Sequence, residues 1–166
     1  MVLLSDRAFA GADTLATSYT LSKAIEKLGQ ELPVDLVLCG KQAIDGDTAQ
    51  TGPGIATWLG LTQFTYVVAV DELDLGKRQI QVKRRVAGGV EVIRGPLPAL
   101  LTVELELAEP RRAPLPSLIA SLREPVAVWD AQAMDASPER LGIKGSPTWV
   151  RAISSPPARE GGPKFD

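Results

Sequence analysis

Two spacings of apolar residues alternate along the first half of the chain. Short apolar runs at residues 2–4, 34–39 and 64–70 have the length and composition of buried strands. Between the first two runs, from residue 13 to residue 28, apolar side chains recur at about the helical period. A second helix is expected to end near Leu59, before the third run. Strands that alternate with helices favour a parallel α/β sheet with right-handed crossovers.

The ends of the first helix carry their own signals. Asp13 or Thr14 can cap its N-terminus, because a short polar side chain accepts hydrogen bonds from the first free amides. Gly29 stands where a glycine ends many helices, and Pro33 then breaks the pattern. We therefore expect the helix to end at residue 28.

The second half of the chain adds an antiparallel element. Expected strands at residues 80–86 and 90–93 flank residues 87–89, Ala-Gly-Gly, which have the composition of a hairpin turn. Residues 97–107 are apolar enough for a central strand. The predicted fold class is α/β, with a mostly parallel, Rossmann-like sheet, flanking helices and an antiparallel hairpin.

The chain becomes irregular after this central strand. Residues 109–117 hold three prolines and are expected to be exposed, and a short helix at 118–123 and a strand at 126–129 follow. After residue 130 the periodicity fades, which predicts an extended C-terminal arm and no second core. We therefore expect an α/β domain at residues 1–130 and an arm at 131–166.

The composition limits the partners of the chain. Of its 166 residues, 45% are hydrophobic and 23% charged, which suits one globular domain. A formal charge of −2 and a pI near 5.3 argue against nucleic acid as a partner, because such a binding face should be basic. No apolar run approaches the ~20 residues that a membrane helix needs, so no membrane insertion is expected.

Two residue types decide which reaction mechanisms remain open. The single cysteine, Cys39, excludes an internal disulfide and suits a reducing compartment, so a cytoplasmic location is expected. The chain has no histidine, which excludes Ser-His-Asp and Cys-His catalysis and the usual zinc sites. We expect no metal site, and any chemistry must come from carboxylates, lysine, tyrosine or a bound cofactor.

The loop at residues 40–53, GKQAIDGDTAQTGP, carries the most chemical information. It joins a predicted strand to a predicted helix, and open α/β sheets bind ligands at the carboxyl ends of their strands. The first turn of the helix has free amides and the positive end of the helix dipole, which suit a phosphate group. Gly40 and Gly46 allow tight or left-handed backbone near a ligand.

The side chains of this loop fit the same interpretation. Gln50 and Thr51 can donate to phosphate oxygens, and Asp45 or Asp47 can accept from ribose hydroxyls or cap the helix. The loop is neither a Walker sequence nor a GxGxxG motif. A capped turn with solvated aspartates explains these residues equally well, so the loop alone leaves both interpretations open.

Four ordered segments resemble the beta subunits of electron-transfer flavoproteins. The loop at residues 40–53 resembles the nucleotide-binding loop of that family, and VKRRVAGGVEVIRGPLPALLT at 82–102 resembles its signature stretch. EPRRAPLPSL at 109–118 resembles the partner-recognition loop, and LGIKGSPT at 141–148 is typical of the tail. Ala87 departs from the pattern, since the family usually has an acidic residue there.

The resemblance implies a heterodimer in which an alpha subunit holds most of the redox-active FAD. The beta subunit's own site holds AMP in many members and a second FAD in the electron-bifurcating members, with its ADP half in the AMP position. IDGDTAQ followed by Gly-Pro is closer to the bifurcating branch, and the segment at residues 6–18 also resembles it. The binding residues that the resemblance implies are Asp13, Thr14, Thr17, Ser18, Gly40, Lys41, Gln42, Ala43, Ile44, Asp45, Gly46, Asp47, Thr48, Ala49, Gln50 and Thr51.

Leu115 is the candidate partner-binding residue. It lies between Pro114 and Pro116, which restrict the backbone and can hold an apolar side chain outward. In the resembled family this leucine docks on acyl-CoA dehydrogenases. From the residues alone, a leucine folded back under its own loop is the stronger interpretation, since single surface leucines are common.

The resemblance implies an electron-carrier subunit and not an enzyme that works alone. Two other classes remain open: an enzyme domain that cleaves ATP between its alpha and beta phosphates, and a nucleotide-sensing module with no redox role. Family members begin with a strand and loop that precede the matched region and help to hold the adenine. We therefore expect the domain at residues 1–130 to be incomplete at its N-terminus and to bind nucleotide weakly, and the arm at 131–166 to contact the alpha subunit.

Overall fold

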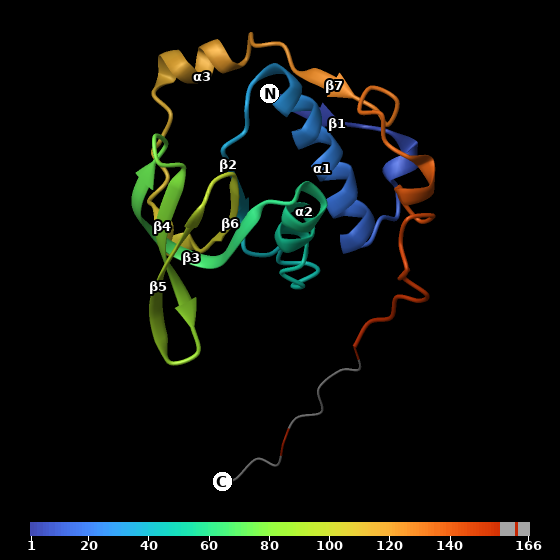
Figure 1. Ribbon diagram of the computed structural model, residues 1–166. Helices are drawn as coiled ribbons and strands as arrows, with labels where there is room; N and C mark the ends of the chain where they lie inside the picture. The colour runs from blue at the N-terminus through green and yellow to red at the C-terminus, as the bar shows by residue number, and fades with distance from the viewer. Residues whose placement is uncertain (157–161, 163–166) are drawn as a thin grey trace.

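A five-stranded mixed sheet forms the centre of the computed structural model, which describes residues 1–156 and 162 (Figure 1). In spatial order its strands are β2 (Leu36–Gly40), β6 (Ala99–Val103), β3 (Thr62–Asp74), β4 (Gln79–Val86) and β5 (Gly89–Pro96). β6 is parallel to both β2 and β3, whereas β4 and β5 form an antiparallel hairpin on β3. The predicted α/β class, with a parallel core and a hairpin, is confirmed.

Two helices, α1 (Thr14–Glu31) and α2 (Thr51–Leu59), lie side by side against the parallel strands (Figure 1). Ile55 of α2 packs with Leu100 of β6, and Leu21 of α1 adds a partly buried side chain to the same cluster. Asp13 caps the N-terminus of α1 through hydrogen bonds from two backbone amides, as the sequence predicted.

The remaining elements lie outside the main sheet. β1 (Val2–Leu4) and β7 (Ala127–Trp129) form a separate parallel pair. The short helix α3 (Leu115–Ser121) precedes β7 and buries none of its residues. The single-turn 3₁₀ helices are η1 (Arg7–Phe9), η2 (Leu105–Leu107) and η3 (Pro138–Arg140). Within the described part of the chain, each helix is too short or too polar to cross a membrane.

β6 determines how closely α2 approaches the sheet. Four successive residues of this strand, from Ala99 to Thr102, are buried, which fits a central parallel strand covered on both faces. A Cβ atom at Gly52 of α2 would lie 2.4 Å from Thr102 Cγ2, so only glycine fits between helix and strand. The first turn of α2 is therefore held beside the carboxyl ends of β6 and its neighbour β2.

Three expected boundaries are wrong. Gly29 does not end α1, because the helix continues to Glu31 and the Leu32 amide donates to the Leu28 carbonyl in place of a glycine cap. The central strand expected at residues 97–107 is limited to β6, and η2 follows it. The helix expected at residues 118–123 begins at Leu115, because prolines are compatible with a first helical turn.

The segment after residue 130 packs against the N-terminal part of the chain. Met134 and Leu141 are buried, and the Tyr19 hydroxyl of α1 accepts a hydrogen bond from the Ser137 amide at 3.0 Å. Of its described residues only η3 forms a helical turn, as an irregular arm would. Residues 157–161 and 163–166 of the predicted arm lie outside the described residues, and the division at residue 130 stays a prediction.

Replacing Gly54 by valine should destabilise the fold by about 1–3 kcal/mol, because overpacking forces neighbouring groups apart. A Cβ atom at Gly54 of α2 would lie 2.6 Å from Ser18 Oγ of α1, and Ser18 is itself buried. Urea unfolding followed by circular dichroism measures the loss. Gly89→Val is the control, since a Cβ atom there meets nothing within 4 Å. Equal stability of the two variants would contradict the tight contact between α1 and α2.

Candidate nucleotide-binding site

A cavity of about 840 Å³ opens where the carboxyl end of β2 meets the N-termini of α1 and α2. Thirteen of the sixteen predicted nucleotide-binding residues line this cavity. The lining residues are Asp13, Thr14, Thr17, Gly40, Lys41, Gln42, Ala43, Asp45, Gly46, Thr48, Ala49, Gln50 and Thr51. The structure therefore brings together two segments that are separated by more than twenty residues in the sequence.

Ser18, Ile44 and Asp47 do not line the cavity. Ser18 is buried between the two helices, and its hydroxyl donates to the Leu15 carbonyl at 2.8 Å. The Ile44 side chain is fully exposed to solvent. Asp47 accepts a hydrogen bond from the Gln42 side-chain amide and thereby stabilises the loop itself. Ser18 and Asp47 therefore have partners within the fold, and a nucleotide contact of any of the three residues stays a prediction.

The left-handed backbone of the loop is not at its glycines. The φ angles of Asp47 and Ala49 are 50° and 54°, whereas neither Gly40 nor Gly46 has a positive φ angle. Left-handed backbone costs energy at residues other than glycine, and such residues are enriched at ligand sites. Of the two conformations expected for Gly40 and Gly46, the left-handed one is absent at both, whereas Gly46 does lie in a tight turn.

The N-terminus of α2 is the best anion site in the cavity. Gln50 occupies the capping position but makes no side-chain bond to the helix, because its carbonyl oxygen accepts from the Thr14 hydroxyl at 2.9 Å. The amides of Thr51 and Gly52 belong to the first turn, which has no intrahelical acceptors. An uncapped helix N-terminus that faces a cavity suits a phosphate group.

The N-terminus of α1 has the opposite character. One carboxylate oxygen of Asp13 accepts from the Leu15 and Ala16 amides, at 2.9 and 3.1 Å. The other accepts from the Thr148 hydroxyl at 2.8 Å and the Thr148 amide at 3.2 Å. A negative charge already occupies this helix end, so a phosphate group is disfavoured there.

The arm contributes to the cavity through these Asp13 contacts. Thr148 and Val150 also line the cavity, and neither was among the predicted nucleotide-binding residues. The Ser146 hydroxyl accepts from the Asp13 amide at 2.8 Å and fixes the same segment. The GSPT tail motif was the available signal, because it contains Ser146 and Thr148.

The other cavity residues give it an apolar floor and little free charge. Leu21 and Ile55 lie below the polar loop, and Cys39 joins them as a half-buried thiol whose pKa is raised by burial. Lys41 is the one basic residue among those that line the cavity, and its Nζ atom lies 3.2 Å from a Glu104 carboxylate oxygen. The site therefore offers backbone amides and hydroxyls more than free cations.

The predicted partner-binding segment forms the start of α3. Pro114 precedes the helix, Pro116 lies in its first turn, and 67% of Leu115 is exposed. Leu118 and Leu122 follow at helical spacing and are exposed as well. The alternative of a leucine folded back under its loop is wrong, because Leu115 is part of an apolar stripe that faces solvent.

The fold and the cavity together define an α/β domain with a cavity at the carboxyl end of a parallel strand, which is where open α/β sheets bind ligands. Residues 1–134 match the family model described as the electron transfer flavoprotein domain, and the chain belongs to this family.

Similar proteins include Protein FixA of Azotobacter vinelandii, which is 47% identical over 95% of the chain. The caffeyl-CoA reductase-Etf complex subunit CarD of Acetobacterium woodii is 44% identical, and the electron transfer flavoprotein subunit beta of Megasphaera elsdenii is 42% identical, each over 96% of the chain. The chain spans 57% of the length of the first protein and 59% of the other two.

Replacing Asp13 by alanine should lower the free energy of unfolding by about 1–2 kcal/mol at neutral pH, because a helix cap is lost. Burial alone would raise the pKa of Asp13, but hydrogen bonds from Ala16, Thr148 and Leu15 outweigh it and lower the pKa. The wild-type advantage is therefore present above the ordinary carboxyl pKa and is lost as the pH falls through the lowered value.

Urea unfolding of wild type and Asp13→Ala between pH 7 and pH 2 measures this difference. Asp45→Asn is the control, since Asp45 lines the cavity without a hydrogen bond from the described residues. A difference that stays constant down to pH 2 would contradict a role for the ionised Asp13 carboxylate.

Proposed function

We propose that the chain acts as a beta-type subunit of an electron-transfer flavoprotein. In this role it binds an adenine nucleotide and works with an alpha subunit that carries the redox-active FAD. The observation that supports it most is the cavity beside the uncapped α2 N-terminus, in a chain of this family. When bound, the flavin supplies the redox chemistry, and this chain positions the nucleotide and the partner.

The cavity fits an adenosine phosphate. A phosphate group at the Thr51 and Gly52 amides would meet the positive end of α2, away from the Asp13 carboxylate. The apolar floor at Leu21 and Ile55 suits a purine ring, and Asp45 is free to accept from a ribose hydroxyl. AMP fits this arrangement, and so does the ADP half of a second FAD.

The choice between AMP and FAD rests on the loop sequence. IDGDTAQ followed by Gly-Pro is closer to the bifurcating branch, which favours a second FAD on this chain. CarD of Acetobacterium woodii is a subunit of a caffeyl-CoA reductase-Etf complex. The cytoplasmic location stays a prediction.

The two other functional classes have less support. An enzyme that cleaves ATP would need free cationic groups around the phosphates, and the single basic residue of the cavity, Lys41, is paired with Glu104. A nucleotide sensor would not need an exposed apolar α3 of the kind that docks on a partner.

The first test is the nucleotide that denaturation releases from the chain, purified together with its alpha subunit. We expect two FAD per heterodimer if this chain holds the second flavin, and one FAD with one AMP if it holds AMP. A heterodimer without any adenine nucleotide beyond the alpha subunit's FAD would contradict the proposal.

The Thr51→Val variant connects that result to the cavity. It should weaken nucleotide binding about tenfold, because a hydroxyl donor to a charged phosphate is lost. Isothermal titration of the heterodimer, stripped of nucleotide, measures the affinity. Thr57→Val removes the same hydroxyl on the exposed far end of α2 and should bind like wild type. Equal affinities of the two variants would contradict a contact between the Thr51 hydroxyl and the phosphate.

The Leu115→Ala variant tests the proposed docking of acyl-CoA dehydrogenase-type flavoenzymes on α3. We expect kcat/KM for electron transfer from such a partner to fall at least about tenfold, since an apolar anchor is lost from the interface. Leu75→Ala, in the exposed turn between β3 and β4, is the matched control. An unchanged kcat/KM would show that α3 is not the docking element.

A further inference from the structure

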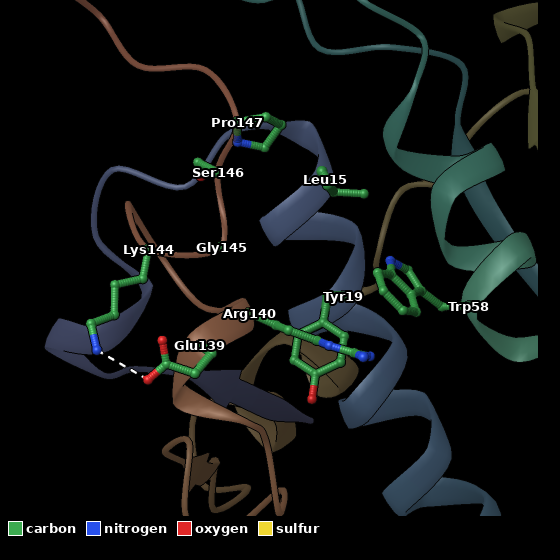
Figure 2. Close-up of a pocket in the computed structure, with 9 residues that line it drawn as sticks. All are labelled: Leu15, Tyr19, Trp58, Glu139, Arg140, Lys144, Gly145, Ser146 and Pro147. Atoms are coloured by element: carbon green, nitrogen blue, oxygen red, sulfur yellow. Dashed lines mark hydrogen bonds and ion pairs between the residues drawn. The ribbon is translucent and has the colours of Figure 1, made fainter.

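A second cavity, of about 430 Å³, is shown in Figure 2, and the residues of α1 that line it differ from those that line the nucleotide cavity. Leu15 and Tyr19 of α1 form one wall, Trp58 of α2 forms another, and the segment from residue 139 to residue 147 closes it. Figure 2 shows the Arg140 side chain lying across the Tyr19 ring and pointing toward Trp58.

Arg140 is held in place by two aromatic rings. Its guanidinium carbon lies 5.6 Å from the centre of the Tyr19 ring and 5.1 Å from the centre of the Trp58 ring. The rings themselves meet edge to face at 5.2 Å. The Tyr19 hydroxyl is fixed by the Ser137 amide, so the whole stack is anchored to the backbone. Such stacking orients a guanidinium group without using its N–H donors.

The other polar groups of this pocket are already paired. Lys144 and Glu139 form an ion pair with 3.1 Å between nitrogen and oxygen, which Figure 2 marks at the rim. The Ser146 hydroxyl donates to the Gly142 carbonyl at 2.7 Å and accepts from the Asp13 amide. In the described parts of the chain, no acceptor or carboxylate pairs with the Arg140 guanidinium. The pocket thus combines apolar walls with one oriented, unpaired cation.

We propose that this pocket receives a carboxylate side chain of the partner subunit, which forms a bidentate pair with Arg140. The inference rests on the proposed function, since it needs the alpha subunit as the partner. A planar guanidinium fork matches a carboxylate. Leu15 and Pro147 at the rim suit apolar residues on either side of the acid.

The surface next to the pocket favours a polypeptide occupant over a small molecule. Three apolar residues within six positions of Pro147 are largely exposed: Trp149, Val150 and Ile153, at 72%, 76% and 91%. Large exposed apolar side chains that lie close together in the chain are typical of a protein-binding segment. This segment continues along the chain from Pro147, which lines the pocket.

The test measures the dissociation constant of the heterodimer for wild type, Arg140→Gln and Arg140→Lys. Arg140→Gln should raise it at least about tenfold, because a charge-assisted bidentate pair is lost. Arg140→Lys keeps the charge but not the planar fork, so its dissociation constant should lie between those of wild type and Arg140→Gln. Arg7→Gln is the control: it removes the charge of an arginine in η1 that is exposed and unpaired within the described residues.

A second measurement covers the case in which Arg140→Gln unfolds. A benzoylphenylalanine photo-crosslinker at position 144, on the rim, should join the alpha subunit at a peptide that contains Asp or Glu. No crosslink to the alpha subunit, or an Arg140→Gln heterodimer as tight as wild type, would overturn the inference. If wild type itself forms no heterodimer, the proposed function fails as well.

Butyrate titrated into the isolated chain identifies a small-molecule site. Millimolar butyrate binding that Arg140→Gln abolishes, without any change in heterodimer affinity, would mean that the pocket takes free carboxylates and would also overturn the inference. We expect butyrate to compete with heterodimer formation or not to bind.

Discussion

The contact between α2 and β6 is the constraint on which the candidate site depends. Because Gly52 has no side chain, the first turn of α2 lies directly against Thr102 of the buried central strand. β2 is the parallel neighbour of β6, so the same contact brings the turn beside the carboxyl end of β2. The loop that joins β2 to α2 is thereby folded over a cavity whose most polar wall is an uncapped helix end.

The two helix ends at this cavity differ in charge, and this difference would orient the nucleotide that we propose to bind there. Each N-terminus carries a partial positive charge of roughly half a unit. The carboxylate of Asp13 neutralises it at α1, whereas α2 has no side-chain cap. A phosphate is therefore attracted to Thr51 and Gly52 and repelled from Asp13. Hydroxyl groups of a ribose can approach the acidic side without that repulsion.

Much of this arrangement could be predicted because it depends on local signals. The strand, loop and helix from β2 to α2 are adjacent in the sequence, and their apolar spacing and polar loop are sufficient to locate the cavity. Asp13 was recognised as a cap for the same reason, since the backbone amides that donate to its carboxylate lie two and three residues away.

The missed features depend on distant contacts or on backbone energetics. Asp13 and Thr148 are separated by 135 residues, and no periodicity connects them. The left-handed residues Asp47 and Ala49 were missed because sequence reasoning assigns such backbone to glycine. Ser18 was predicted to bind nucleotide, as Thr17 was, and both have a hydroxyl group. Its closeness to Gly54, which no sequence pattern indicates, shows that the Ser18 side chain faces α2.

The arm connects the two cavities that border α1. Ser146 and Pro147 line the Arg140 pocket, and Thr148, the next residue, lines the nucleotide cavity. The backbone and carboxylate of Asp13 hold this short segment in one position through Ser146 and Thr148. A ligand that stabilises the segment from either side stabilises the same backbone conformation. If binding in one cavity changes the affinity of the other cavity for its ligand, the reverse effect must be equally large, because a coupling free energy between two sites is reciprocal.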